Sequence, residues 1–284
     1  MGTTYPVVMR PALDRNWCIE SAQDSAELIA EARPLIENDP VETDDLLNLV
    51  AAHAGYLSVA DPLSPDLLSV MAVGSDAASI LFACGSAEPG ATVSIPLSDG
   101  RVIVGQGTGP TDMTYPGNWL RSFWFAVIGR LTSALDILAA TPLSVLRASP
   151  TETDEYYYRY VDTLAAVWRG DVDLPDRLIA ALDATEESQL EIADPDFVLD
   201  IIVPQMEILY RMIDSESDSE DFNEALAKAL RLHHRFWTRT ADRRNDPDGY
   251  IAWGPLALAI MARDNGISIE VTSDYLPTVL LNNV

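Results

Sequence analysis

Basic residues are scarce in this sequence. Its 284 residues contain 18 lysines and arginines against 44 aspartates and glutamates, which gives a formal net charge of −26 at pH 7. Such a field repels phosphate backbones and anionic membranes and attracts cationic partners. We therefore expect neither nucleic acid nor a membrane surface as the partner. A role in solubility alone is the alternative explanation of the charge.

Cysteines and long apolar stretches are also few. The two cysteines, Cys18 and Cys84, lie far apart in sequence and suit buried thiols in a reducing cytoplasm better than a disulfide framework. The longest apolar stretches, residues 123–129 and 251–262, are shorter than the roughly 20 residues that span a bilayer. Residues 1–14 lack the continuous apolar segment of a signal peptide. The expected compartment is the cytoplasm.

Histidine is rare, and its placement argues against a metal centre. Two of the three histidines, His233 and His234, are adjacent, so a helix directs them about 100° apart, and neither has a ligand partner at helical spacing. His233 is expected to be a hydrogen-bonded core residue.

The glycines at 105, 107 and 109 lack the Gly-Lys-Ser/Thr that follows in a phosphate loop. The sequence therefore predicts no metal, no cofactor and no catalytic residue. An acid–base pair formed in space stays open, and two converging carboxylates in a deep pocket would indicate it.

Periodic apolar residues predict a mainly α-helical protein. The first half should contain two antiparallel helices around residues 28–35 and 46–57, a helix from Ser64 and Pro65 to about residue 82, a β-hairpin over residues 92–104, and one long central helix over residues 118–139. The second half should contain a helical hairpin over residues 157–184, a helix over residues 197–213 kinked by Pro204, a helix from Ser219, a helix opened by Pro255, a strand over residues 267–271 and a turn over residues 273–277.

The expected architecture is an irregular antiparallel helical bundle or α-solenoid-like array, with a small β-hairpin and a short C-terminal strand. Residues 1–284 are expected to form a single large domain. Two packed halves, residues 1–148 and 149–284, are the alternative.

Acidic residues concentrate in residues 152–224, which hold 21 acidic and four basic side chains, a net charge of −17. Two clusters there are the candidate partner-binding residues: Asp194, Asp196, Asp200, Asp214, Glu216, Asp218, Glu220 and Asp221. Solvated helix ends, with Asp218 as an N-cap, are the alternative. Residues 228–244 reverse the sign, with six basic and one acidic side chain. Arg235 and Arg239 there complement a helix dipole, and a local anion site or an internal partner for the acidic helices is the other interpretation.

The C-terminal segment carries a distinctive pattern. A Gly-Pro-Leu-Ala-Leu-Ala helix leads through a Gly-Ile-Ser-Ile-Glu-Val run to a Ser-Asp-Tyr-Leu-Pro ending. Over roughly the last 65 residues the chain resembles the bacterial immunity protein 49 family. The signature residues are Trp237, Gly254, Pro255, Gly266, Glu270, Ser273, Asp274, Tyr275, Leu276 and Pro277. The resemblance implies structural roles for them and no catalytic residues.

The resemblance also implies a mostly helical cytoplasmic protein, encoded beside a polymorphic toxin, that protects its producer by binding this toxin. With the acidic charge, we expect an immunity protein that neutralises a basic toxin without catalysis, a nuclease being the expected target class. The alternative is a tetratricopeptide-like scaffold protein built on residues 156–184, which exposed aromatic side chains such as Tyr156 and Tyr158 would favour. The oligomeric state stays open.

Overall fold

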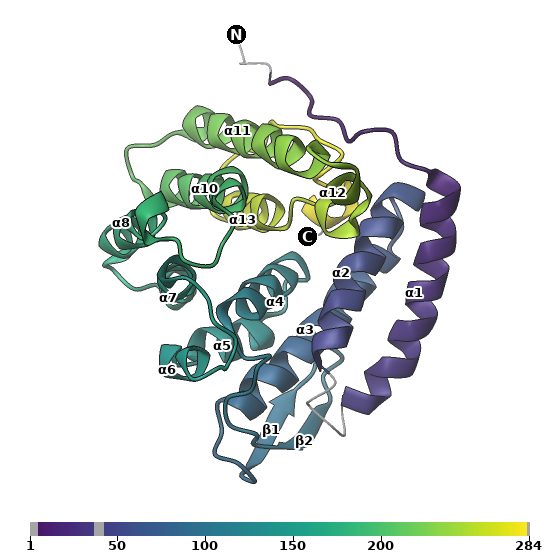
Figure 1. The fold of residues 1–284 in the computed structure, drawn as a ribbon, viewed down its shortest axis with the longest axis vertical. Helices are drawn as coiled ribbons and strands as arrows, with labels where there is room; N and C mark the ends of the chain where they lie inside the picture. The colour runs from purple at the N-terminus through teal and green to yellow at the C-terminus, as the bar shows by residue number, and fades with distance from the viewer. Residues whose placement is uncertain (1–4, 37–42, 283–284) are drawn as a thin grey trace.

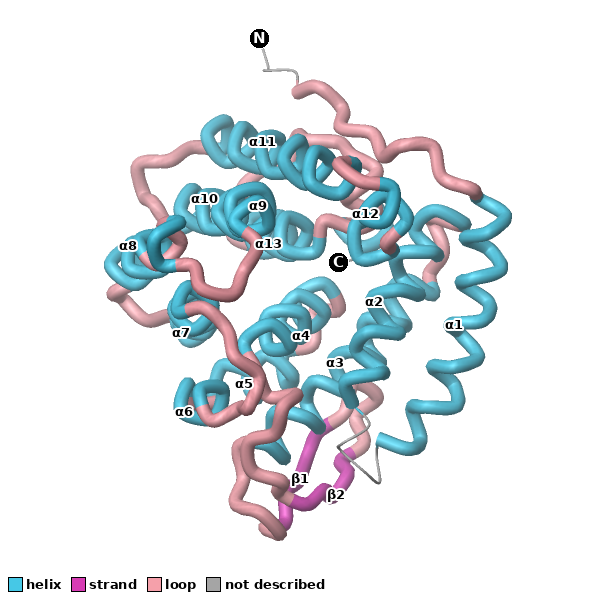
Figure 2. The backbone as a smooth tube through the Cα atoms, viewed as in Figure 1, coloured by secondary structure: helices cyan, strands magenta, loops and turns pink. Residues whose placement is uncertain are grey.

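The computed structural model describes residues 5–36 and 43–282, and these are mainly α-helical (Figures 1 and 2). The first half contains α1 (Arg15–Ile36), α2 (Thr43–Ala60), α3 (Asp66–Gly85), β1 (Thr92–Pro96), β2 (Val102–Gln106), α4 (Pro116–Ile128), α5 (Thr132–Ala140) and α6 (Leu143–Arg147). The second half contains α7 (Glu155–Arg169), α8 (Leu174–Asp183), η2 (Glu187–Gln189), α9 (Pro195–Phe197), η3 (Val198–Ile202), α10 (Val203–Ile213), α11 (Ser219–Thr238), α12 (Ala241–Asn245), η4 (Pro247–Gly249), α13 (Trp253–Asp264) and α14 (Thr278–Leu281).

The predicted helical pair at the start of the chain is confirmed. α1 and α2 pack antiparallel, with α1 outermost, and α3 follows on the inner side of α2 (Figure 1). Gly74 of α3 allows close packing, because a Cβ there would lie 2.6 Å from the Phe125 ring and 2.9 Å from Val50. Within the described chain, α3 alone has the length and composition of a membrane span, but 78% of that window is buried inside the protein. Core helices meet the same criterion, so this is weak evidence for a span.

The β-hairpin is also confirmed. β1 and β2 pair antiparallel, with Val93 opposite Gly105. Gly100 in the turn has φ = 83°, a left-handed conformation that glycine adopts without steric cost. Asp76 of α3 accepts hydrogen bonds from the Ser98 N–H (2.7 Å) and hydroxyl (2.9 Å), which fastens the hairpin to the helices.

The single helix predicted over residues 118–139 is wrong, because α4 ends at Ile128 and α5 begins at Thr132. Arg130 adopts φ = 57°, the Arg130 N–H donates to Val127 O (3.1 Å), and the Leu131 N–H donates to Ala126 O (2.9 Å). This is the hydrogen-bond pattern of a Schellman motif, which ends a helix. The Arg130 guanidinium also pairs with Asp264 at the end of α13, so a tertiary contact accompanies this unusual backbone conformation.

The helical hairpin α7–α8 forms as predicted, and Gly170 ends α7 in the left-handed conformation. Its aromatic side chains are not exposed, however. Tyr156 and Tyr158 are 0% and 7% exposed and belong to the core, so the exposed aromatic side chains that would favour a scaffold protein are not found at these two positions. Pro204 was expected to kink or split the helix, and the helical segment does change type just before it, from the π-helical turn η3 to α10. A π turn accommodates a proline that lacks the N–H needed for a regular helical hydrogen bond.

The strand predicted over residues 267–271 is wrong. Residues 267–271 have no regular secondary structure, and among the described residues the nearest β contact is the isolated bridge between Val8 and Ser273. The buried Asn223 takes the place of a strand, because its amide donates to Ser268 O (2.8 Å) and accepts from the Glu270 N–H (2.8 Å). One side chain thus makes the hydrogen bonds to the Ser268 carbonyl and the Glu270 N–H that a second strand would otherwise make.

The N-terminal arm joins the C-terminal segment. The Ser273 hydroxyl donates to Val8 O (2.6 Å), and Asp274 accepts from the Arg10 N–H (3.1 Å). The Arg10 guanidinium continues to the Ser58 hydroxyl (2.7 Å) and to Tyr250 O (3.2 Å). The main hydrophobic cluster takes in buried residues from both halves of the sequence. The division into one or two domains stays a prediction.

Candidate functional site

The first predicted acidic cluster forms ion pairs within the protein. Asp194 pairs with Arg243 (2.8 Å), Asp196 pairs with Arg239, and Asp200 accepts from Arg235 Nε (3.1 Å) and lies 3.8 Å from Arg239. The basic end of α11 and α12 is therefore the internal partner of this acidic turn, one of the alternatives that the sequence left open. Asp200 is only 3% exposed, which leaves its carboxylate no surface for another protein.

The second predicted cluster surrounds the start of α11. Asp218 is the N-cap and accepts from the backbone N–H groups of Glu220 (2.8 Å) and Asp221 (3.0 Å), and Asp221 completes a capping box. Hydrogen bonds from the Glu216 N–H and from the Ser217 hydroxyl lower the pKa of Asp214. The aspartates of this cluster thus organise the connection between α10 and α11. Glu216 and Glu220 are exposed on the same connection.

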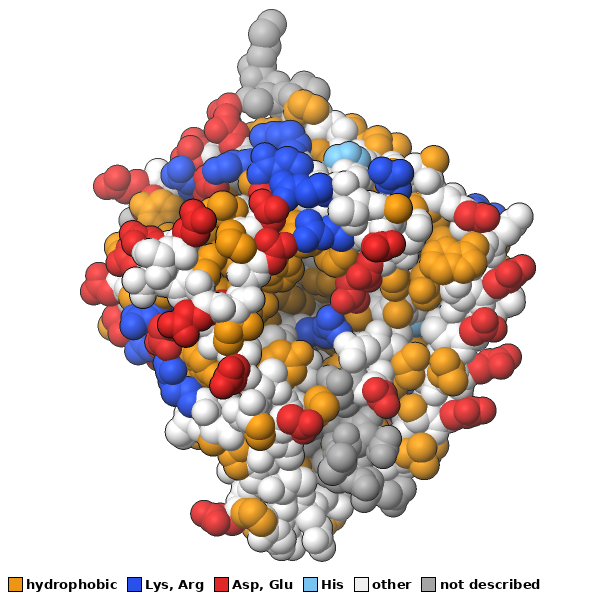
Figure 3. Space-filling model, in the orientation of Figure 1, with side chains coloured by type: hydrophobic (Ala, Val, Ile, Leu, Met, Phe, Trp, Pro, Cys, Tyr) orange, Lys and Arg blue, Asp and Glu red, His pale blue; other side chains and the backbone are white. Residues whose placement is uncertain are grey.

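Most lysine and arginine side chains form ion pairs with carboxylates of the same protein. At least twelve of the 18 lysine and arginine side chains lie within 4.0 Å of a carboxylate of the described residues. Figure 3 shows basic side chains gathered over α11 and α12 with acidic side chains beside them. The surface beyond these pairs is therefore dominated by acidic groups.

A third acidic group, which was not among the predicted contact residues, lies on α1. Glu20, Asp24, Glu27 and Glu31 are all exposed, and none forms an ion pair with another described residue. Their spacing of four, three and four residues places them on one helix face. Figure 3 shows acidic side chains in a row along the edge that α1 forms. We call these four residues the α1 acidic ridge. The helical spacing was the signal that could have identified it.

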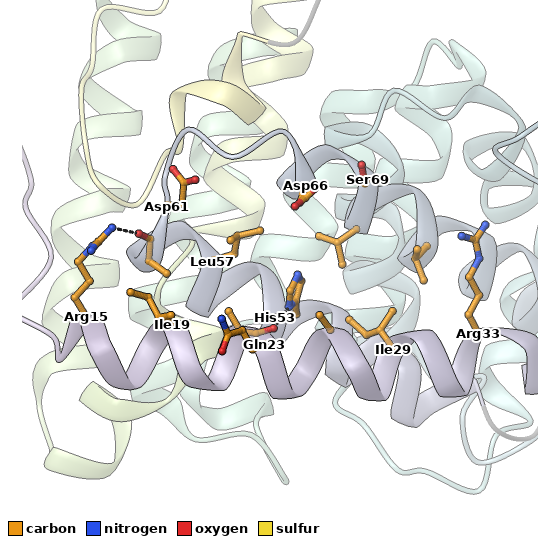
Figure 4. A pocket seen from close by; sticks show the side chains of 15 residues that line it. Arg15, Ile19, Gln23, Ile29, Arg33, His53, Leu57, Asp61, Asp66 and Ser69 are labelled. Atoms are coloured by element: carbon orange, nitrogen blue, oxygen red, sulfur yellow. Dashed lines mark hydrogen bonds between the residues drawn. The ribbon is translucent and has the colours of Figure 1, made fainter.

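A groove of about 610 Å³ lies between α1 and α3, with α2 as its floor, on a different face of α1 from the ridge (Figure 4). Its walls are mainly apolar, including Ile19, Ala26 and Val73. His53, which is 8% exposed, lies in its floor. The Nδ1 atom of His53 is 3.0 Å from both Ala22 O and the Ser25 hydroxyl, and burial lowers the pKa of the imidazole.

A second cavity, of about 240 Å³, lies between α4, α10, α11 and α13, and we call it the central cleft. Figure 3 shows a hollow with a hydrophobic floor in the middle of this face, between α12 and α4. Aromatic side chains line it, among them Trp124, Tyr157 and Trp253. Gln205 also lines the cleft and is 5% exposed, and its side-chain oxygen has no hydrogen-bond partner among the described residues.

The signature residues lie near this cleft or hold the C-terminal segment. Trp237, Gly254 and Pro255 line the cleft, and a side chain at Gly254 would overlap the Gln205 carboxamide. Gly266 follows α13 with φ = 88°. Tyr275 is buried against His233, with ring centroids 4.8 Å apart. The remaining signature residues belong to the segment that Asn223 and the N-terminal arm hold: Glu270, Ser273, Asp274, Leu276 and Pro277.

The described histidines and cleft carboxylates have structural partners. His233 is a buried core residue as predicted, with Nε2 2.9 Å from Gly249 O, and burial lowers its pKa to about 4. No group of three or more potential metal-binding side chains occurs in residues 5–36 and 43–282. Of the described acidic residues, Asp248 alone lines the central cleft, where it pairs with Arg121 (2.9 Å). The cleft lining thus brings one carboxylate, already paired with an arginine, to this site. Both cysteines are free and buried, as predicted.

Comparisons with known proteins identify the family. No curated protein and no solved structure matches the chain significantly. A family model described as Immunity protein 49 matches residues 65–280, which extends from the start of α3 into α14 and includes the central cleft. The match also takes in the signature segment at the C-terminus. The chain therefore belongs to the Immunity protein 49 family.

Proposed function

We propose that this protein is a cytoplasmic immunity protein that binds a cognate toxin and neutralises it without catalysis. Membership of the Immunity protein 49 family supports this function. The buried Tyr156 and Tyr158 remove the feature that would have favoured a scaffold protein.

The distribution of charge is the observation that supports a basic partner. Because most lysines and arginines are engaged in ion pairs within the chain, a partner would meet a field set by a net charge of −26. A toxin domain with a basic active surface complements that field, and nucleases need such a surface to grip phosphates. We therefore propose a basic toxin, with a nuclease as the target class. Carboxylates of the immunity protein would occupy the cationic groups that the toxin uses on its substrate.

The predicted contact residues divide by accessibility. Asp200 is buried, and Asp194 and Asp196 each have an arginine partner. Glu216, Asp218 and Glu220 are exposed at the start of α11. Since Asp218 caps α11, its reversal would unfold the helix start as well as change the charge. Of the predicted residues, Glu216 is thus the one whose substitution tests binding with least effect on folding.

The test is co-expression with the toxin encoded beside the gene, followed by co-purification and by measurement of the dissociation constant at several salt concentrations. We expect rescued growth, a stable complex, and an association rate that falls by about tenfold or more when the ionic strength rises from 0.01 to 1 M. Failure to rescue growth together with failure to co-purify would refute the immunity function. Rescue with an association rate independent of salt would refute the electrostatic part alone.

A further inference from the structure

We propose that the central cleft binds a small, flat, uncharged molecule that carries an amide group, such as a ring with a carboxamide or a lactam. The inference concerns a ligand other than the toxin and does not depend on the proposed immunity function. All the residues that line the cleft lie between positions 115 and 255, within the family match. The cleft thus belongs to the part of the chain that the family model describes.

Aromatic rings give the cleft flat and firmly held walls. The Trp253 indole packs edge-to-face on Phe125, with ring centroids 5.2 Å apart. The Trp237 indole lies against Gly249, where any side chain would overlap the ring. Trp237, Trp253 and Tyr157 are half-buried and line the cleft. At about 240 Å³ the cleft is smaller than the roughly 300–1,000 Å³ that drug-sized ligands occupy, so a molecule with a single ring fits it.

Gln205 adds a specific polar group to this aromatic lining. Its side chain is 5% exposed and lines the cleft, and its Oε1 atom has no hydrogen-bond partner among the described residues. Gly254 gives the carboxamide its place, because a Cβ there would lie 2.5 Å from Oε1. A ligand N–H at this oxygen would satisfy a buried acceptor that is costly to leave without a donor. Since a carboxamide presents an N–H beside its oxygen, another amide matches it with two hydrogen bonds.

The charges of the cleft cancel, so the lining fits an uncharged ligand. Arg121 and Asp248 are the charged residues of the described lining, and they pair with each other at 2.9 Å. His233 is neutral at pH 7, because burial lowers its pKa to about 4. An anion would be repelled by the net charge of −26, and a cation would find no unpaired carboxylate among the described lining residues.

Three probes of nearly the same shape test the site on the full-length protein: benzamide, acetophenone and benzoate. Benzamide has both an N–H and a C=O group, acetophenone lacks the donor, and benzoate lacks the donor and is charged. Heteronuclear NMR of the tryptophan indole N–H groups detects binding, with each signal assigned from the corresponding Trp→Phe variant. Three of the six tryptophans line the cleft (Trp124, Trp237 and Trp253), and the other three serve as internal controls (Trp17, Trp119 and Trp168).

We expect benzamide to bind with a dissociation constant of about 1 mM or below and to shift the cleft signals but not the control signals. Acetophenone and benzoate should bind at least about fivefold more weakly, because neither donates to Gln205 Oε1. Gln205→Met keeps a side chain of similar size and removes the acceptor, so benzamide and acetophenone should bind this variant with equal affinity. The matched control Gln189→Met, at an exposed glutamine outside the cleft, should keep the preference for benzamide. Circular dichroism verifies that both variants are folded.

Three results would overturn the proposal. If benzamide leaves the cleft signals unchanged, or shifts the control signals as strongly, the cleft is not its binding site. If the wild type binds benzamide and acetophenone equally well, the ligand needs no amide. If Gln205→Met retains the preference for benzamide, another group makes the contact. None of these results bears on the immunity function, which co-expression with the toxin tests separately.

Discussion

Gln205 and Asn223 are two buried carboxamides on adjacent helices, and we predict that loss of their polar atoms has opposite effects on stability. The Gln205 side-chain oxygen has no hydrogen-bond partner among the described residues, and the side chain is 5% exposed. Asn223, which is 1% exposed, donates to Ser219 O (2.7 Å) and Ser268 O (2.8 Å) and accepts from the Glu270 N–H. The same chemical group is therefore unsatisfied in one helix and fully used in the next.

The magnitudes follow from this difference. A buried polar group without a partner costs about 1–3 kcal/mol. Gln205→Met keeps an unbranched side chain of similar size, so we expect the free energy of unfolding to rise by about 1–2 kcal/mol. Asn223→Leu removes all three hydrogen bonds, each worth about 0.5–1.5 kcal/mol net. It also leaves the backbone of residues 268–270 without its partner, so we expect a loss of about 2–4 kcal/mol.

Urea unfolding followed by circular dichroism measures both effects, and an unchanged m-value would show that the extent of unfolding is the same in each variant. The double variant should give the sum of the two changes within about 0.5 kcal/mol if the sites are independent. A loss of 1 kcal/mol or more in Gln205→Met would refute the reasoning. It would mean that the Gln205 oxygen is satisfied in solution, for instance by water in the central cleft.

Two further predictions concern pH and packing. Burial lowers the pKa of His233 to about 4, so the folded protein favours the neutral ring. The contribution of this group to the free energy of unfolding is fully present above the unfolded pKa of about 6.5. It falls by up to about 3 kcal/mol as the pH drops towards 4. Urea unfolding of the wild type at pH 7 and pH 4.5 should show this loss of stability, and the His233→Gln variant should show a smaller loss. Equal losses in the wild type and the variant would count against a role of His233 in the pH dependence. Gly55→Ala would place a methyl group onto the Pro247 carbonyl oxygen where α2 meets η4, and should cost about 1–3 kcal/mol in the same assay. Unchanged stability would mean that the two elements separate easily.

Most helices could be predicted because local patterns specify them. In α11 the apolar stripe containing Phe222, Leu226 and Leu230 is buried, and Asp218 caps the helix as expected. The hairpin turn could also be predicted from nearby residues, because Gly100 alone supplies the left-handed conformation that the turn needs. Such features need only the few residues around them, so a single sequence contains the information.

The failures required information from distant residues. Nothing near Arg130 predicts that it adopts a left-handed conformation and pairs with Asp264, 134 residues away. The strand predicted from alternating apolar residues depended on a neighbouring strand, and Asn223, 45 residues away from Ser268, takes its place. Alternation shows only which side of an extended segment is buried, not what pairs with its edge.

The candidate site was harder to predict than the fold. Net charge indicated an acidic surface, but it could not show that Asp200 is buried beneath Arg235, or that Asp194 pairs with Arg243. Exposure and ion pairing depend on how α9, α11 and α12 meet in space. The α1 acidic ridge was detectable from its spacing, whereas the groove between α1 and α3 depends on how three helices pack.

The junction between the N-terminal arm and the C-terminal segment has a consequence for the order of folding. Val8 and Arg10 find their partners, Ser273 and Asp274, at separations of 265 and 264 residues. Contacts so distant in sequence form late, because closing a long loop costs entropy before the contact is made. The arm therefore has nothing to dock on until the segment around Ser273 has been synthesised and placed by the helices between them, and a chain that stopped before this segment would leave the arm undocked.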